Sequence, residues 1–139
     1  MQPRAAEVCG DNWREENGEK EYLPLLQAAL AGERKVPPPE GRIGEAWLAC
    51  ALYRLEGERA LWEVLSSADE LFYRVPPYDE LSWAFLRLRK RGWLMVDGER
   101  FGLTPEGRRV IHDLKGRDDH LHWWEKIERW IYDHPLGDE

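Results

Sequence analysis

The chain carries a tight cluster of cations, namely Arg87, Arg89, Lys90 and Arg91. Side chains of this kind can grip a phosphate strand, and neutralising phosphates is the main source of affinity for nucleic acid. Cations also collect at helix C-termini, where they interact favourably with the helix dipole and remain solvated. Both interpretations of the cluster stay open.

Three tryptophans and two isoleucines recur at helical spacing near the C-terminus. The segment from about 118 to 134 predicts a helix whose apolar stripe is too wide to be left in water. The stripe can pack on the rest of the chain as a lid, or on the same helix of a second copy. Because Trp is enriched in interface hot spots and a two-fold contact needs one self-complementary stripe, we expect a homodimer. The candidate interface residues are Trp123, Trp124, Ile127, Trp130 and Ile131.

The remaining reactive side chains do not combine into a site. His120 and His122 are two residues apart, so on a helix they point to different faces, whereas a zinc pair on one helix needs a spacing of three or four. The sequence shows no Gly-rich phosphate loop, no nucleophile elbow and no Cys with an obvious His partner. We therefore expect no catalytic residue, no metal and no cofactor, and we interpret Cys50 as a small core residue.

Apolar residues recur at helical spacing in six segments, about 19–30, 43–55, 61–72, 77–91, 105–114 and 118–134. The sequence Val36-Pro37-Pro38-Pro39 predicts a stiff connector that spaces the first helix from the body. The expected core comprises Trp47, Leu61, Val64, Leu65, Leu71, Leu81, Phe85, Leu88 and Leu103.

Two short apolar runs, Trp93–Val96 and Arg100–Leu103, flank an Asp97-Gly98 turn and predict a β-hairpin. Thr104 can then cap a helix whose first residue, Pro105, has no amide to leave unsatisfied. This hairpin and the junction Leu-Thr-Pro-Glu-Gly-Arg at 103–108 resemble the winged helix-turn-helix superfamily, as found in small bacterial regulators. The resemblance implies a mainly α fold with a small two-stranded β wing. It divides the chain into an N-terminal tail, helix and connector (1–39), a winged-helix domain (40–116) and a C-terminal Trp-rich helix (117–139).

The resemblance also assigns possible DNA contacts to the helix 77–91 and the wing 93–104. The side chains concerned are Ser82, Arg87, Arg89, Lys90, Arg91 and Arg100. Acidic residues at the start of that helix (79–80) and at the wing tip (97 and 99) would repel phosphates, and the net charge of the chain is −7.

We therefore expect a non-catalytic interaction module whose partner is a second copy or another protein, with a DNA-binding transcriptional regulator as the alternative. The sequence contains no run of about 18 apolar residues and no start typical of a signal peptide. A cytoplasmic protein with no membrane partner is expected on that ground.

Overall fold

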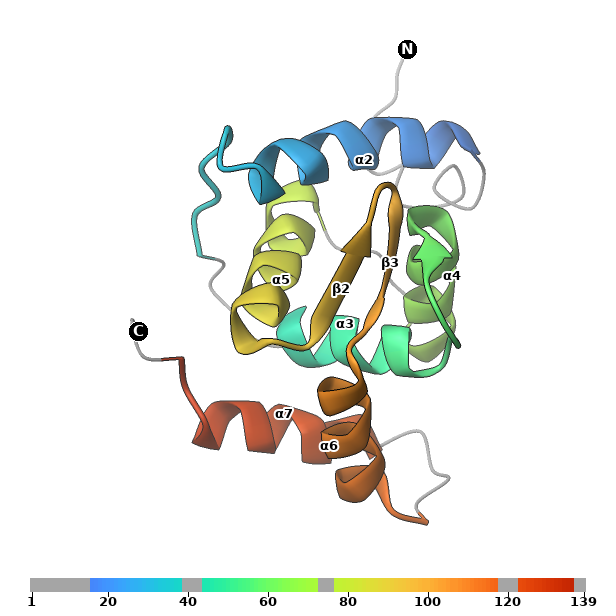
Figure 1. Ribbon diagram of the computed structural model, residues 1–139, viewed down its shortest axis with the longest axis vertical. Helices are drawn as coiled ribbons and strands as arrows, with labels where there is room; N and C mark the ends of the chain where they lie inside the picture. Colours follow the sequence, from blue (N-terminus) through green and yellow to red (C-terminus); the bar gives the residue numbers. More distant parts are fainter. Residues whose placement is uncertain (1–15, 39–43, 73–76, 118–122, 137–139) are drawn as a thin grey trace.

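The computed structural model describes residues 16–38, 44–72, 77–117 and 123–136, which contain six helices and a small sheet (Figure 1). The helices are α2 (Glu16–Leu30), α3 (Gly44–Tyr53), α4 (Leu61–Phe72), α5 (Tyr78–Arg91), α6 (Pro105–Lys115) and α7 (Trp124–Asp133). The strands are β1 (Arg59–Ala60), β2 (Leu94–Asp97) and β3 (Arg100–Leu103). The fold is thus mainly α with a small antiparallel sheet, which is compatible with a winged helix. None of the helices in the described ranges is long and apolar enough to cross a membrane.

Helix α3 forms the centre of the molecule, because every residue from Gly44 to Leu52 is buried. It contacts α4, α5, α6, α7 and β3, and its three alanines and one cysteine allow these neighbours to approach closely. The last carbonyls of a helix lack partners within it. Here the guanidinium of Arg108 donates to the carbonyl oxygens of Leu52, Tyr53 and Leu55, at 3.4, 3.0 and 2.7 Å.

The sheet has three strands in the order β1-β3-β2, and both pairs are antiparallel. The prediction of a two-stranded wing is wrong in this respect, because Arg59 and Ala60 pair with Phe101 and Arg100. A strand of only two residues has no apolar alternation by which a sequence pattern can reveal it.

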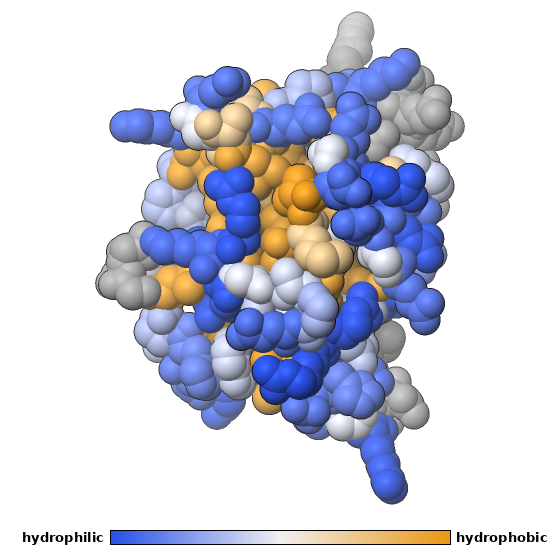
Figure 2. All heavy atoms as spheres, viewed as in Figure 1, coloured by the Kyte–Doolittle hydropathy of each residue, from blue (hydrophilic) through white to orange (hydrophobic). Residues whose placement is uncertain are grey.

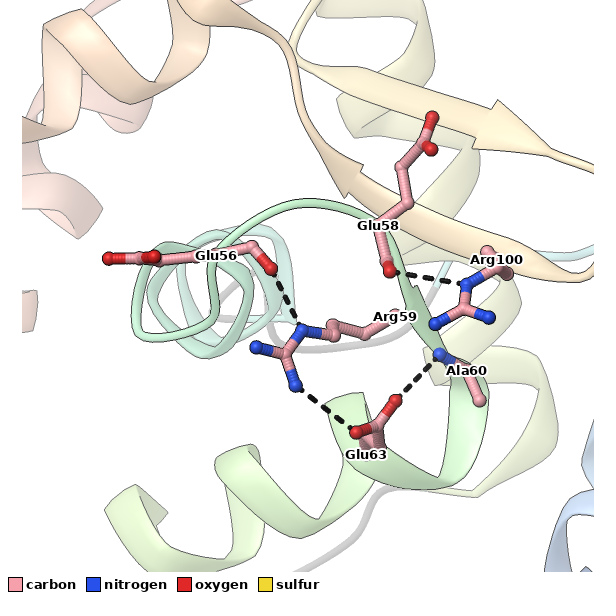
Figure 3. Close-up of polar contacts among 6 residues, drawn as sticks. All are labelled: Glu56, Glu58, Arg59, Ala60, Glu63 and Arg100. Carbon is pink, nitrogen blue, oxygen red and sulfur yellow. Dashed lines mark hydrogen bonds and ion pairs between the residues drawn. The ribbon is translucent and has the colours of Figure 1, made fainter.

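Figure 3 shows the polar contacts that fix β1 and the start of α4. The Arg59 guanidinium donates to the carbonyl oxygen of Glu56 at 2.8 Å and pairs with the Glu63 carboxylate at 3.2 Å. Glu63 also accepts a hydrogen bond from the backbone N–H of Ala60 at 3.0 Å. A glutamate that reaches back to the residue before its helix satisfies an otherwise unpaired amide, so Glu63 defines where α4 begins.

The hairpin and its junction with α6 are confirmed. Val96 pairs with Phe101 in the β2–β3 ladder, and Gly98 in the turn has a φ of 64°, which glycine adopts without steric cost. The Thr104 hydroxyl accepts a hydrogen bond from the N–H of Gly107 at 3.1 Å. The wing and the helix that follows it therefore follow from the local sequence.

Helix α2 belongs to the core, and the prediction that the proline connector spaces it from the body is wrong. Tyr22 and Leu26 are fully buried, and α2 packs on α5 and α4 (Figure 1). The apolar stripe of α2 needs cover, and the body of the chain provides it. The predicted core residues are buried, except that the side chain of Leu71 lies outside the described residues.

Replacing Leu88 by Ala tests this core. Leu88 is 0% exposed on α5, so the Leu88→Ala variant should lose about 2–5 kcal/mol of unfolding free energy. The measurement is urea denaturation followed by circular dichroism. The matched control is Leu86→Ala on the same helix, where the side chain is only half-buried. Equal losses for the two variants would mean that α5 does not face the core as described.

Candidate interaction surface

Helix α5 is the segment to which the resemblance assigns DNA contacts, and α2 covers its N-terminal half. The Tyr78 hydroxyl donates to the carboxylate of Glu21 at 2.8 Å, and the rings of Tyr78 and Tyr22 meet edge to face with centroids 4.5 Å apart. Just beyond α2, the Arg34 guanidinium pairs with Asp79 and donates to Ser82 Oγ at 2.7 Å. The first two turns of α5 are therefore held against another part of the chain.

Three of the predicted DNA contacts point inward. Ser82 is buried beneath Arg34, Arg87 is only 9% exposed, and the guanidinium of Arg91 is also shielded from solvent. Arg87 and Arg91 both face the carboxylate of Glu45 in α3. None of these three side chains lies on a free surface of α5.

The other predicted contacts are exposed but do not converge on one site. Arg89 and Lys90 are exposed at the C-terminal end of α5, where Arg89 donates to the carbonyl oxygen of Leu30 at 2.9 Å. Arg100 donates instead to the carbonyl oxygen of Glu58 at 3.2 Å and thereby ties β3 to the start of β1 (Figure 3). Whether any of them contacts DNA remains a prediction.

Glu45 is a buried carboxylate in the first turn of α3, at 3% exposure. One of its oxygens lies 2.9 Å from Nε of Arg91, and the other lies 3.8 Å from Nε of Arg87. A buried charge is stable only when it is paired and hydrogen-bonded. Arg87 and Arg91 thus serve as counter-ions to the Glu45 carboxylate of the central helix α3.

Arg91 also connects α5 to the C-terminal helix. Its guanidinium lies 5.7 Å from the ring of Trp93 and 5.8 Å from that of Trp130, within the range of cation–π attraction. It donates a hydrogen bond to the carbonyl oxygen of His134 at 2.8 Å, and the His134 ring stacks on Trp130. One side chain therefore joins α3, α5, the start of β2 and the end of α7.

The tryptophan stripe of α7 faces the chain itself. Trp123, Ile127 and Ile131 are buried, Trp124 and Trp130 pack against the same core, and α7 contacts α3 and α6. Of the two alternatives for this stripe, the structure shows the intramolecular one. An interface between copies at Trp123, Ile127 and Trp130 would require α7 to leave this position. His120 and His122 lie outside the described residues.

The hairpin presents the free surface of this region. Val96 is 44% exposed, although it is a large apolar residue, and Asp97 and Glu99 at the tip are exposed. Figure 2 shows an apolar area between α2, α5 and β2, bordered by hydrophilic side chains. Apolar surface rimmed by polar residues is typical of contact sites.

The described residues contain no group of three or more His, Cys, Asp or Glu side chains able to hold a metal ion. The Cys50 thiol is buried, and burial, followed by the proximity of Glu128, raises its pKa. A thiol that stays protonated is a poor nucleophile. Cys50 thus packs as a small core residue.

Sequence reasoning missed two residues that organise this region, Glu45 and Arg34. Glu45 is the one charged residue in the otherwise apolar or neutral segment 44–53, and an acid so placed is a signal for a buried ion pair. Arg34 gave no such signal, since its partners Asp79 and Ser82 are 45 and 48 residues away.

No family model matches the chain, and no curated protein or solved structure is significantly similar to it.

The buried ion pair of Glu45 and Arg91 predicts that a nearly isosteric substitution of Glu45 lowers the unfolding free energy strongly. Glu45→Gln removes the charge and leaves the shielded guanidinium of Arg91 without its counter-ion, so we expect a loss of about 3–5 kcal/mol in unfolding free energy. The control is Glu70→Gln, which makes the same change in the exposed pair with Arg54 and should cost less than about 1 kcal/mol. Urea denaturation measures both. Similar small losses would show that Glu45 is not a buried ion-pair partner.

The position of α7 gives a second expectation. Trp123→Ala should destabilise the folded chain by about 3–5 kcal/mol, because it opens a cavity in a packed core. Tyr132→Ala is the control, since Tyr132 is 77% exposed on the same helix. Denaturation and light scattering should be measured together. A Trp123→Ala protein with wild-type stability but half the wild-type mass would mean that the stripe is an intermolecular surface after all.

Proposed function

We propose that the protein is a non-catalytic winged-helix interaction module. The order α3-β1-α4-α5-β2-β3 with a β1-β3-β2 sheet supports the winged-helix assignment. Under that assignment, α5 would correspond to the reading helix of DNA-binding members of the superfamily. The non-catalytic role is supported by a sequence without a phosphate loop, a nucleophile elbow or a Cys–His pair.

The observation that carries the proposal is the cover over α5. A reading helix must present its N-terminal residues to base edges in the major groove, whereas Tyr78, Asp79 and Ser82 are each bonded to α2 or to Arg34 just beyond it. These polar contacts border an apolar interface in which Tyr22 and Leu26 are fully buried. Opening it would expose apolar surface rather than a phosphate-binding face.

The charge of the remaining surface supports the same conclusion. Phosphate contacts supply most of the affinity of a protein for DNA, whereas the wing tip carries two acids, Asp97 and Glu99, against one cation, Arg100. Exposed cations remain at Arg89 and Lys90, at the C-terminal end of α5, and at Arg100 in the hairpin. They favour the alternative of a DNA-binding regulator only if they bind phosphates without the covered N-terminal turns of α5 entering the groove.

A DNA-binding assay distinguishes the two functions. We expect fluorescence anisotropy with a labelled mixed-sequence duplex to show no saturable binding at physiological salt, and any binding at low salt to disappear as salt is added. Tight binding at physiological salt would overturn the proposal, provided that Arg89→Ala reduces the salt slope by about one unit. Arg109→Ala, at an exposed position on α6, serves as the control and should leave that slope unchanged.

A further inference from the structure

Strand β2 lies at an open edge of the sheet. The order β1-β3-β2 leaves one side of β2 unpaired. Asp97 and Arg100 close the hairpin, and Thr104 N–H donates to the carbonyl oxygen of Trp93 at 2.8 Å. Because hydrogen-bonding sides alternate along a strand, the N–H and C=O groups of Leu94 and Val96 point to the open edge. Within the described ranges, no residue supplies a hydrogen-bond partner for them.

Apart from its shortness, this edge lacks the features that usually protect an exposed strand. Lysine, proline and bulges discourage strands from pairing with another chain, and the residues of β2 are Leu, Met, Val and Asp. Of the two residues whose backbone groups face this edge, Val96 is exposed and Leu94 is buried. The N–H and C=O groups at this edge can thus pair with another strand.

Helix α5 provides a surface beneath an added strand. The rings of Phe85 in α5 and Phe101 in β3 meet edge to face with centroids 5.0 Å apart, so α5 packs on the core face of the sheet. A strand added to β2 would continue the sheet over α5. The apolar area that Figure 2 shows between α2, α5 and β2 would then be covered.

We propose that β2 pairs antiparallel with β2 of a second copy of this chain, so that two sheets join across a two-fold axis. The inference names the partner of the interaction module and rests on that proposed function. A two-fold contact is self-complementary, so each favourable contact occurs twice.

The charges at the two ends of β2 favour a second copy as the occupant. Only Gly92 and Trp93 separate α5 from β2, so the exposed cations Arg89 and Lys90 lie near the start of the strand. The exposed acids Asp97 and Glu99 lie at its other end. Antiparallel pairing brings the acidic tip of each copy beside the basic helix end of the other. Since β2 has only four residues, the interface is small and the dimer should be weak.

The first test concerns the backbone at the open edge. Val96→Pro removes an N–H that does not pair with β3, and it should leave the wild-type fold intact by circular dichroism. Val96→Thr keeps that N–H and is the matched control. Analytical ultracentrifugation of the full chain up to high micromolar concentration should show a monomer–dimer equilibrium for the wild type and for Val96→Thr, and about tenfold weaker association for Val96→Pro.

The second test reverses the charges. A tip variant with Asp97→Lys and Glu99→Lys, and a helix variant with Arg89→Glu and Lys90→Glu, should each associate at least about tenfold more weakly than the wild type. Mixing the two variants makes both sets of contacts attractive again, so a heterodimer should form. Restored association upon mixing is not expected from an interface elsewhere.

Several results would overturn the inference. One is a wild type that stays monomeric throughout the concentration range, and another is a dimer that neither Val96→Pro nor the charge variants weaken. A third is a chain that stays monomeric and whose Val96 amide resonance shifts only when an extended segment of another protein is added. That result would mean that the edge binds a different protein rather than a second copy. The DNA assay fails or succeeds independently of these measurements, so the loss of the dimer and the loss of the proposed function are distinguishable.

Discussion

The buried carboxylate of Glu45 is the constraint on which the arrangement of the helices depends. It lies at the start of a helix that is enclosed on every side, and a charge in that position must have a counter-ion within reach. Arg91 and Arg87 supply it from α5, which fixes the position of α5 relative to α3. Arg91 also lies beside the adjacent rings of Trp93 and Trp130 and donates to the carbonyl of His134, which extends the same constraint to the wing and to α7.

Because Arg87 and Arg91 pair with a buried acid, they add little positive charge to the surface. Two of the four cations at the end of α5 point into the molecule, while the acids at the wing tip point outward. A chain with a net charge of −7 that also turns two of these arginines inward has less positive potential at this end of α5 to attract phosphates. Half of the cation cluster therefore pairs with a buried acid, and the interpretation based on the helix dipole alone is incomplete.

The local parts of the fold were predictable, and the long-range parts were not. The Asp97-Gly98 turn, the Thr104 cap and the helical stripe with Leu81, Phe85 and Leu88 follow from short-range rules that involve neighbouring residues only. Strand β1 was missed because two residues have no period, and the docking of α2 was missed because Arg34 and Asp79 are far apart in the sequence. For the C-terminal stripe, the pattern established that Trp123 and Ile127 need cover. It did not establish which surface covers them, because apolar surface carries no direction.

Helix α2 on one side and the helix pair α6–α7 on the other change what the central unit offers to a partner. Helix α2 lies across one end of α5 and α4, and α6 and α7 lie at the opposite end of the molecule (Figure 1). Each covers apolar surface of the central unit. Neither reaches the outer edge of β2, where Leu94 and Val96 have no hydrogen-bond partner among the described residues. Side-chain packing can be satisfied within one chain in many ways, but the N–H and C=O groups of a strand edge need hydrogen-bond partners, which a further strand, polar side chains or water can supply. For that reason, these additions leave the sheet edge as the surface best suited to a contact between chains.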